Sequence, residues 1–194
     1  SILNKELKDG IKKENIVKVK ECIVKIVDNH FSEPRHGSLK GIDLTVNLLI
    51  DEYFGQYAIL ANFAKMQNKD YTTAVHSINV MALTLAFSFY LKLSKVKIYN
   101  YGLSALLHDI GKVEIPDSIL KSERKLSSDE YNLVKKHPII GVDILKDYTF
   151  PKDVIDGCIH HHERLDGSGY PTGLKGDAIT EIGKILAIID PFEA

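Results

Sequence analysis

The sequence predicts an all-α protein, and two observations carry this prediction. Apolar residues recur at three- to five-residue intervals through most of the chain, as on one face of an amphipathic helix. Nowhere do apolar and polar residues alternate as they do in a half-buried strand. Hydrophobic residues make up 44% and charged residues 26% of the 194 residues, which is typical of a globular domain. We therefore expect one helical domain, or one domain with a helical extension.

The N-terminal third is predicted to contain two helices. The first covers residues 3–28, where apolar side chains repeat with helical spacing. Proline and glycine interrupt this spacing over residues 30–41, which indicates a loop. Asp43 then suits the N-cap position of a second helix running to about Met66, because its carboxylate can accept from free backbone N–H groups.

The middle of the chain is predicted to form two strongly apolar helices. They run from about Thr72 to Leu91 and from about Ser94 to Asp109, and Gly111 is expected to stop the second. Four residues of the first stand three or four apart and therefore share one face. They are His76, Val80, Leu83 and Phe87.

Four shorter helices are predicted in the C-terminal part. Ser127 and Glu130 form a capping-box pattern at the start of the first. Pro138 suits the first turn of the second, where no backbone donor is needed. The four helices cover residues 127–136, 138–147, 153–161 and a segment from Thr180, and a glycine-rich loop over residues 167–177 precedes the last.

Charge, cysteine content and hydropathy exclude several classes of protein. The net charge of -1 gives no basic field for polymeric nucleic acid. Cys22 and Cys158 have no CxxC spacing and form no disulfide framework, which indicates a reducing compartment. The nearly uncharged stretch over residues 81–91 is too short to span a bilayer, and no signal peptide is visible. We expect a cytoplasmic protein without a membrane span in this chain.

The chemistry concentrates in histidines next to carboxylates. A single histidine in an apolar helix is usually a hydrogen-bonded core or surface residue. Adjacent carboxylates weaken that interpretation, because imidazole and carboxylate together are the usual ligands of divalent first-row metals. At a helix end, His108 and Asp109 can both turn inward, and an aspartate can bridge two ions. The histidines are His76, His108, His137, His160, His161 and His162.

Four further charged residues can each be interpreted either as part of the site or as an ordinary structural residue. Lys112 suits a phosphate oxygen beside a metal pair, although alone it reads as a solvated lysine. Asp190 lies in an apolar run, where a lone carboxylate is costly unless it is paired or binds a cation. Glu163 and Arg164 can orient the imidazoles or pair with each other. Three successive histidines can hardly all face one site, so His160 is taken as solvated.

On these residues the chain resembles the HD-GYP subgroup of the HD-domain metal-dependent phosphohydrolases. The resemblance covers about residues 70 to 194 and includes a long, specific motif, HHERLDGSGYP. It divides the chain into a helical N-terminal region of unknown role, residues 1–65, and an HD-GYP domain, residues 66–194. The matching elements are HS at 76–77, HDIGK at 108–112, His137, HHERLDGSGYP at 161–171, GLKG at 173–176 and IIDPFEA at 188–194.

The resemblance implies an HD-superfamily helical bundle and a ligand set for two metals, typically iron or manganese. Asp109 would bridge the ions and, with Lys112, act in catalysis. Two ions about 3.5–4 Å apart can hold a phosphodiester for in-line attack and lower the pKa of water. The first metal would be bound by His76, His108 and Asp190, and the second by His137, His161 and His162. Substrate contacts are predicted for Lys112, Arg164, Asp166, Gly169, Tyr170 and Pro171.

The implied substrate is cyclic di-GMP, cut to pGpG and in some members on to GMP, or a hybrid cyclic dinucleotide. Two other functions stay open, namely a receptor or docking module that binds partners through the Gly-Tyr-Pro loop, and a phosphohydrolase for another nucleotide. A homodimer is a further expectation. Three roles stay open for residues 1–65, namely a sensory domain, a dimerisation element and a signalling linker.

The chain departs from the family pattern at three places. Some members place a glutamate, a ligand of a third metal, where this chain has Thr72, so we predict two metals. Family domains continue past the final aspartate, so this domain is expected to lack its C-terminal part. Pro191 is expected to kink the last helix and to re-aim Asp190.

Overall fold

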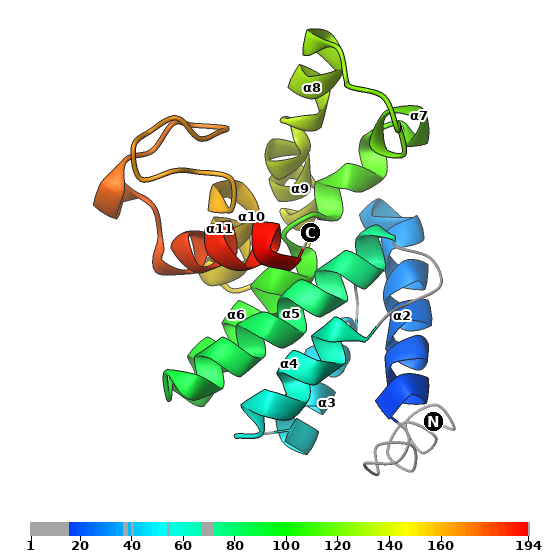
Figure 1. Cartoon of the computed structure of the whole chain (residues 1–194), viewed down its shortest axis with the longest axis vertical. Helices are drawn as coiled ribbons and strands as arrows, with labels where there is room; N and C mark the ends of the chain where they lie inside the picture. The colour runs from blue at the N-terminus through cyan, green and yellow to red at the C-terminus, as the bar shows by residue number, and fades with distance from the viewer. Residues whose placement is uncertain (1–15, 37–38, 40, 54, 67–71, 194) are drawn as a thin grey trace.

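The computed structural model describes residues 16–193 apart from 37–38, 40, 54 and 67–71, and it is helical throughout this part (Figure 1). The described residues contain no strand, so the all-α prediction is confirmed. The α-helices are α2 Ile16–Ser32, α3 Asp43–Tyr53, α4 Tyr57–Lys65, α5 Thr73–Tyr90, α6 Lys95–Leu107, α7 Asp117–Leu120, α8 Ser128–Val134, α9 His137–Leu145, α10 Lys152–His160 and α11 Glu181–Glu193. The 3-10 turns are η2 Pro34–His36, η3 Ile110–Glu114 and η4 Gly176–Ala178.

Helices α5 and α6 form the centre of the bundle and run side by side (Figure 1). Helices α2, α4 and α11 pack against α5, while α3 and α10 pack against α6. The apolar periodicity of the sequence explains this arrangement, because each helix buries its apolar face against a neighbour. One continuous cluster of buried apolar side chains runs from Val19 in α2 to Leu186 in α11. The proposed division between residues 65 and 66 stays a prediction.

Helix α5 is apolar because it lies in the core. By length and composition, Thr73–Tyr90 would be able to cross a membrane, and this apolar stretch is longer than the 81–91 run expected from the sequence. However, 72% of this window is buried within the protein, as in the core helix of a globular fold. Such a helix is weak evidence for a membrane span.

Several helix boundaries differ from the prediction. The helix expected from Asp43 to about Met66 is two helices, separated at Gly55, whose φ of 75° is left-handed. The first helix continues past residue 28 to Ser32, and its predicted start lies outside the described residues. Helix α11 continues through Pro191 to Glu193.

Side-chain hydrogen bonds cap several helix starts, and they confirm the predicted capping box of Ser127 and Glu130. The side chains of Thr72 and Ser94 accept from backbone N–H groups at the starts of α5 and α6. Ser127 and Glu130 form the complete capping box of α8. Pro138 lies in the first turn of α9, as expected. These local signals were readable because caps depend on residues three apart in the sequence.

Lys20 attaches α2 to the end of α4. Its side chain is buried, and Nζ donates to the carbonyl oxygens of Phe63 (3.0 Å), Ala64 (3.3 Å) and Met66 (2.7 Å). Burial lowers the pKa of Lys20 to about 8, so the amine is still protonated at neutral pH. The last carbonyls of a helix lack intrahelical donors, and Lys20 supplies them.

Replacing Lys20 with methionine is therefore expected to lower the free energy of unfolding by about 2 kcal/mol, because carbonyl groups lose their donor. Urea unfolding measures the change. Lys18→Met, at an exposed position of the same helix, is the matched control and should leave stability nearly unchanged. Equal stability of the two variants would contradict this role of Lys20.

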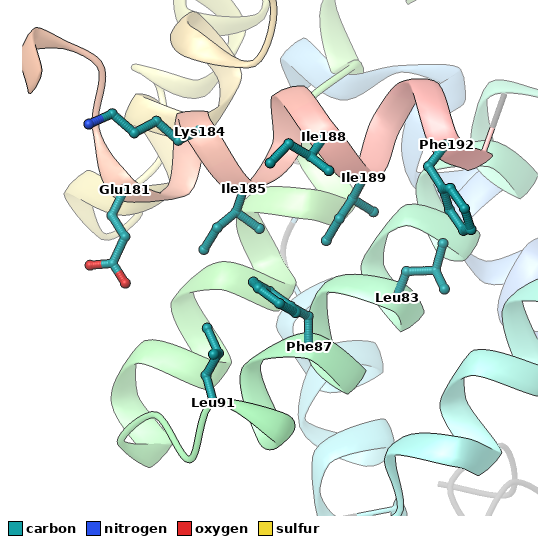
Figure 2. A pocket seen from close by; sticks show the side chains of 9 residues that line it. All are labelled: Leu83, Phe87, Leu91, Glu181, Lys184, Ile185, Ile188, Ile189 and Phe192. Atoms are coloured by element: carbon teal, nitrogen blue, oxygen red, sulfur yellow. The ribbon is translucent and has the colours of Figure 1, made fainter. Parts of the chain in front are cut away.

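An apolar groove lies between α5 and α11 and encloses about 480 Å³ (Figure 2). Its two charged lining residues are engaged elsewhere, since Glu181 pairs with Lys97 (2.7 Å) and Lys184 with Asp177 (3.0 Å). The groove therefore offers apolar contact but no reactive group. Its other lining residues are Leu83, Phe87, Leu91, Ile185, Ile188, Ile189 and Phe192.

Candidate metal centre

Seven side chains from five parts of the chain converge where the helix ends meet. They come from the first turn of α5, the end of α6, the start of α9, the end of α10 and the last turn of α11. Their ligand atoms form two groups, and within each group these atoms lie within 4.8 Å of one another. One group is His76, His108 and Asp190, and the other is Asp109, His137, His161 and His162.

Asp109 lies between the two groups and offers one oxygen to each. Its Oδ2 is 3.6 Å from His76 Nε2 and 3.4 Å from His108 Nε2. Its Oδ1 is 3.2 Å from His137 Nε2 and 3.7 Å from His161 Nε2. The carboxylate is 1% exposed. This is the geometry of a bridging carboxylate, with each oxygen directed at a separate set of imidazoles.

Backbone carbonyls fix the orientation of three of these imidazoles. Nδ1 of His108, His137 and His161 donates to the carbonyl oxygen three residues earlier, at 2.7, 2.7 and 2.9 Å. His108 and His161 are the C-caps of α6 and α10, where carbonyls have no intrahelical partner. The proton on Nδ1 leaves a lone pair on Nε2 when the ring is neutral. Three lone pairs therefore face the carboxylate of Asp109.

The converging lone pairs fit a cation. His137 Nε2 and His161 Nε2 lie only 3.0 Å apart, and two lone pairs at that distance repel unless positive charge lies beside them. His108 Nε2 is buried and has no hydrogen-bond partner among the described residues. Buried polar atoms are normally satisfied, so an orphaned nitrogen in this setting is a free ligand position. The donor set therefore fits divalent metal ions.

The pKa values of His161, His162 and Asp109 keep these three residues in metal-binding form. Burial lowers the pKa of His161 well below its ordinary value, and burial together with His137 lowers the pKa of His162 to about 4. Burial raises the pKa of Asp109, but neighbouring His108 and Lys112 outweigh it and hold the pKa well below its usual range. At neutral pH these imidazoles are neutral and this carboxylate is ionised.

His76 occupies the region of the site where positive charge is most favoured. Burial lowers its pKa, but hydrogen bonds to Asp190 and Glu193 outweigh burial and raise the pKa to about 9. Nε2 is 2.9 Å from Asp190 Oδ1, while Nδ1 donates to Glu193 Oε2. Three carboxylates, those of Asp109, Asp190 and Glu193, therefore surround one imidazole.

Glu193 and Asn79 are site residues that the sequence reading missed. Asn79 Nδ2 donates to Glu193 Oε1 at 2.6 Å, so the carboxylate is fixed between Asn79 and His76. A carboxylate on Nδ1 directs Nε2 of a ligating histidine to the metal. The signal was present, because Asn79 and Glu193 each lie three residues after a predicted ligand and share its helix face.

The Gly-Tyr-Pro loop supports the histidines from outside. The ring of Tyr170 stacks on His162 with centroids 4.6 Å apart. Glu163 does not orient the imidazoles or pair with Arg164; its buried carboxylate accepts from the backbone N–H groups of Thr172, Gly173 and Leu174 at 2.7–3.1 Å. The loop is thereby tied to the end of α10.

The predicted substrate residues of this loop do not line the cleft above the metal centre. Arg164 Nε donates to Ser168 Oγ at 3.1 Å, and Asp166 accepts from Ser168, so both charges stabilise the exposed turn. Gly169 is needed for close packing, because a Cβ there would lie 2.4 Å from the backbone N of Arg164. Tyr170 and Pro171 are likewise absent from the cleft lining.

A cleft of about 710 Å³ opens directly on the metal centre. Lys112 lines it as predicted, with Nζ 2.5 Å from Asp109 Oδ2. His160 lies outside the cleft, and its Nδ1 is 3.0 Å from Thr180 Oγ1, in accord with its exclusion from the ligand set. The remaining lining residues are Asp28, Phe31, Ser32, Thr72, Thr73, Ala74, His76, Asp109, Val113, Asp117, Leu120, Lys121, His162, Asp190 and Pro191.

The family described as HD domain matches residues 58–194, which is well over half of the chain and contains every predicted ligand. This chain belongs to the HD domain family. The HD family match thus begins within α4, close to the predicted start at residue 66.

Relatives of this HD domain bear out the resemblance to HD-GYP proteins. A cyclic di-GMP phosphodiesterase of Pseudomonas aeruginosa is 39% identical over 136 residues, 70% of this chain and 33% of that protein. A 3′3′-cGAMP-specific phosphodiesterase of Vibrio cholerae is 36% identical over 140 residues, 70% of this chain and 26% of that protein. The chain spans about a quarter to a third of the length of these relatives.

The solved structure of Bd1817, described as an HDG"Y"P protein from Bdellovibrio bacteriovorus, has the same fold. It superposes with a TM-score of 0.80 at 22% identity, over 96% of this chain and 64% of that one. The match includes most of the N-terminal region that the HD family match leaves out.

Proposed function

We propose that this protein is a metal-dependent phosphodiesterase that hydrolyses cyclic di-GMP to pGpG. The observation that carries the proposal is the shared carboxylate of Asp109, which faces one group of imidazoles with each oxygen. Paired metal sites of this kind are the usual apparatus for displacement at phosphorus. The names of the relatives support the choice of a cyclic dinucleotide.

Two divalent ions, iron or manganese, are proposed as cofactors. His76, His108 and Asp190 would hold one, His137, His161 and His162 the other, and Asp109 both. Such ions neutralise phosphodiester charge and lower the pKa of water. Lys112 contributes a further positive charge at the wall of the cleft, where it can bind a phosphate oxygen.

Anaerobically purified protein should contain about two equivalents of metal, following the proposal, and should convert cyclic di-GMP to pGpG. Chelation should abolish turnover, and added Mn²⁺ or Fe²⁺ should restore it, because no side chain at the site replaces the charge of the proposed ions. Metal analysis and product chromatography measure both. Full turnover by the chelated protein would refute the proposal.

The hybrid dinucleotide 3′3′-cGAMP is a second proposed substrate, because one relative is named for it. The same chromatographic assay with 3′3′-cGAMP at equal concentration decides between the two. Binding of either dinucleotide without turnover, in protein shown to hold two metals, would instead favour a receptor function.

Glu193→Gln is expected to weaken metal binding about tenfold or more, because loss of a carboxylate behind a ligating histidine typically has this effect. Calorimetric titration with Mn²⁺ measures the dissociation constant. Glu181→Gln, on the same helix but exposed at the groove, is the matched control and should keep the wild-type affinity. Equal affinities would contradict the positioning role of Glu193.

A cytoplasmic location and a role in second-messenger signalling complete the proposal. The location is supported by two cysteines that form no disulfide, one of them, Cys158, fully buried. Partner binding through the Gly-Tyr-Pro loop is supported by Leu165, near the start of this loop. Its apolar side chain is 64% exposed. A homodimer stays a prediction.

A further inference from the structure

Two short helical faces form the walls of the cleft above the metal centre. One is Asp28, Phe31 and Ser32 of α2, and the other is Asp117 and Leu120 of α7 with its C-cap Lys121. In both triplets the residues are three and four apart, so each presents one helix face to the cleft. Helix α2 lies outside residues 58–194, the part that the HD family match covers.

The α2 wall combines a carboxylate with an aromatic ring. Asp28 Oδ1 lies 3.5 Å from Thr72 Oγ1, at the long limit of a hydrogen bond, so the carboxylate retains accepting capacity toward the cleft. Asp28 is exposed and lines the cleft, so a ligand there can reach its carboxylate. Partial burial raises its pKa. Phe31, one turn further along the same face, exposes only 6% of its surface and forms an apolar floor beside it.

We propose that the α2 wall is a purine subsite that selects guanine. The Asp28 carboxylate would accept from guanine N1–H and the exocyclic amino group, while Phe31 would contact the apolar face of the base. This inference rests on the proposed cyclic-dinucleotide function. It assigns the wall a substrate role distinct from the phosphate chemistry at Asp109 and Lys112.

The physical reason for selectivity is the donor pattern of the base. Guanine presents two adjacent donors on its Watson–Crick edge, which a carboxylate matches with its two oxygens. Adenine presents an acceptor at N1, and a carboxylate repels it. A cleft of about 710 Å³ falls in the usual size range of ligand pockets, so one ligand can contact both the wall and the metal centre.

The test compares Asp28→Asn with Glu21→Gln, an acidic-to-amide change at an exposed position of α2 outside the cleft. Initial rates with manganese-loaded protein give the kcat/KM for cyclic di-GMP and for cyclic di-AMP. Wild type and Glu21→Gln should prefer cyclic di-GMP, and Asp28→Asn should reduce that preference about tenfold or more, as expected for a two-bond contact to a base. Far-UV circular dichroism confirms that each variant is folded.

A second readout separates this inference from the proposed function. Hydrolysis of bis(p-nitrophenyl) phosphate by manganese-loaded protein needs the metal centre but no base, so it reports on the metal centre alone, and Glu21→Gln should leave it unchanged. Absence of that activity in the manganese-loaded wild-type protein would refute the phosphodiesterase proposal. An unchanged preference between dinucleotides in Asp28→Asn, or equal kcat/KM for both in wild type, would overturn the guanine subsite.

Discussion

Replacing His161 with alanine is expected to lower cyclic di-GMP turnover by more than about a hundredfold, because loss of groups that only support a ligand already costs 10- to 100-fold. His161 Nε2 faces both Asp109 Oδ1 and His137 Nε2, so its removal would take one donor from the second proposed ligand group. Metal analysis of the purified variant should show loss of about one equivalent. Turnover and metal content are measured on the same preparation.

His160→Ala is the matched control, since it removes the same side chain one residue earlier. His160 contacts Thr180 rather than the metal centre, and it does not line the cleft. Turnover and metal content should therefore stay close to wild type. Similar losses in both variants would show that the region responds to any truncation, and that His161 has no special role.

Replacing Gly111 with alanine is expected to lower the free energy of unfolding by more than about 3 kcal/mol, the upper part of the range for overpacking. A Cβ at Gly111 would lie 2.0 Å from the carbonyl oxygen of His137 and 2.6 Å from the backbone N of Gly141. Both contacts are backbone atoms, so no side chain can rotate away. Separation of η3 from α9 would also move His137 away from Asp109.

Gly176→Ala is the control, because nothing lies within 4 Å of a Cβ there. Its φ of 51° is left-handed, which costs about 1 kcal/mol for alanine. Urea unfolding gives both stabilities, and Mn²⁺ titration shows whether the metal centre survives. A Gly111→Ala variant as stable as Gly176→Ala would contradict the close approach of η3 and α9.

The helices could be predicted because their signals are local. The capping box of Ser127 and Glu130 depends on neighbours within one turn, and it forms as expected. Thr72 and Ser94, near the expected starts of α5 and α6, cap them in the same local way. Boundaries were less certain where packing decides them. Helix α6 ends at Leu107, before the expected stop, and Gly111 serves close packing against His137 instead.

Substrate contacts of the Gly-Tyr-Pro loop stay a prediction, while the structure shows what its charged side chains hold in place. Arg164 and Asp166 bind Ser168 within an exposed turn, while Glu163 is buried under the loop backbone. Motif letters cannot distinguish a residue that holds a loop from one that reaches a ligand. That distinction depends on the direction of each side chain in the folded chain.

By itself, the sequence determined the helical class, most helix starts and the seven residues that converge on the metal centre. The class and the helix starts follow from periodicity and capping, and the set of seven follows from ligand chemistry together with the family resemblance. Only the tertiary structure decided that Asp109 faces both groups of imidazoles, that Glu193 stands behind His76 and that α2 forms a wall of the cleft. The physical reason is that such contacts join residues far apart in the chain, and the packing of the helices alone sets their distances.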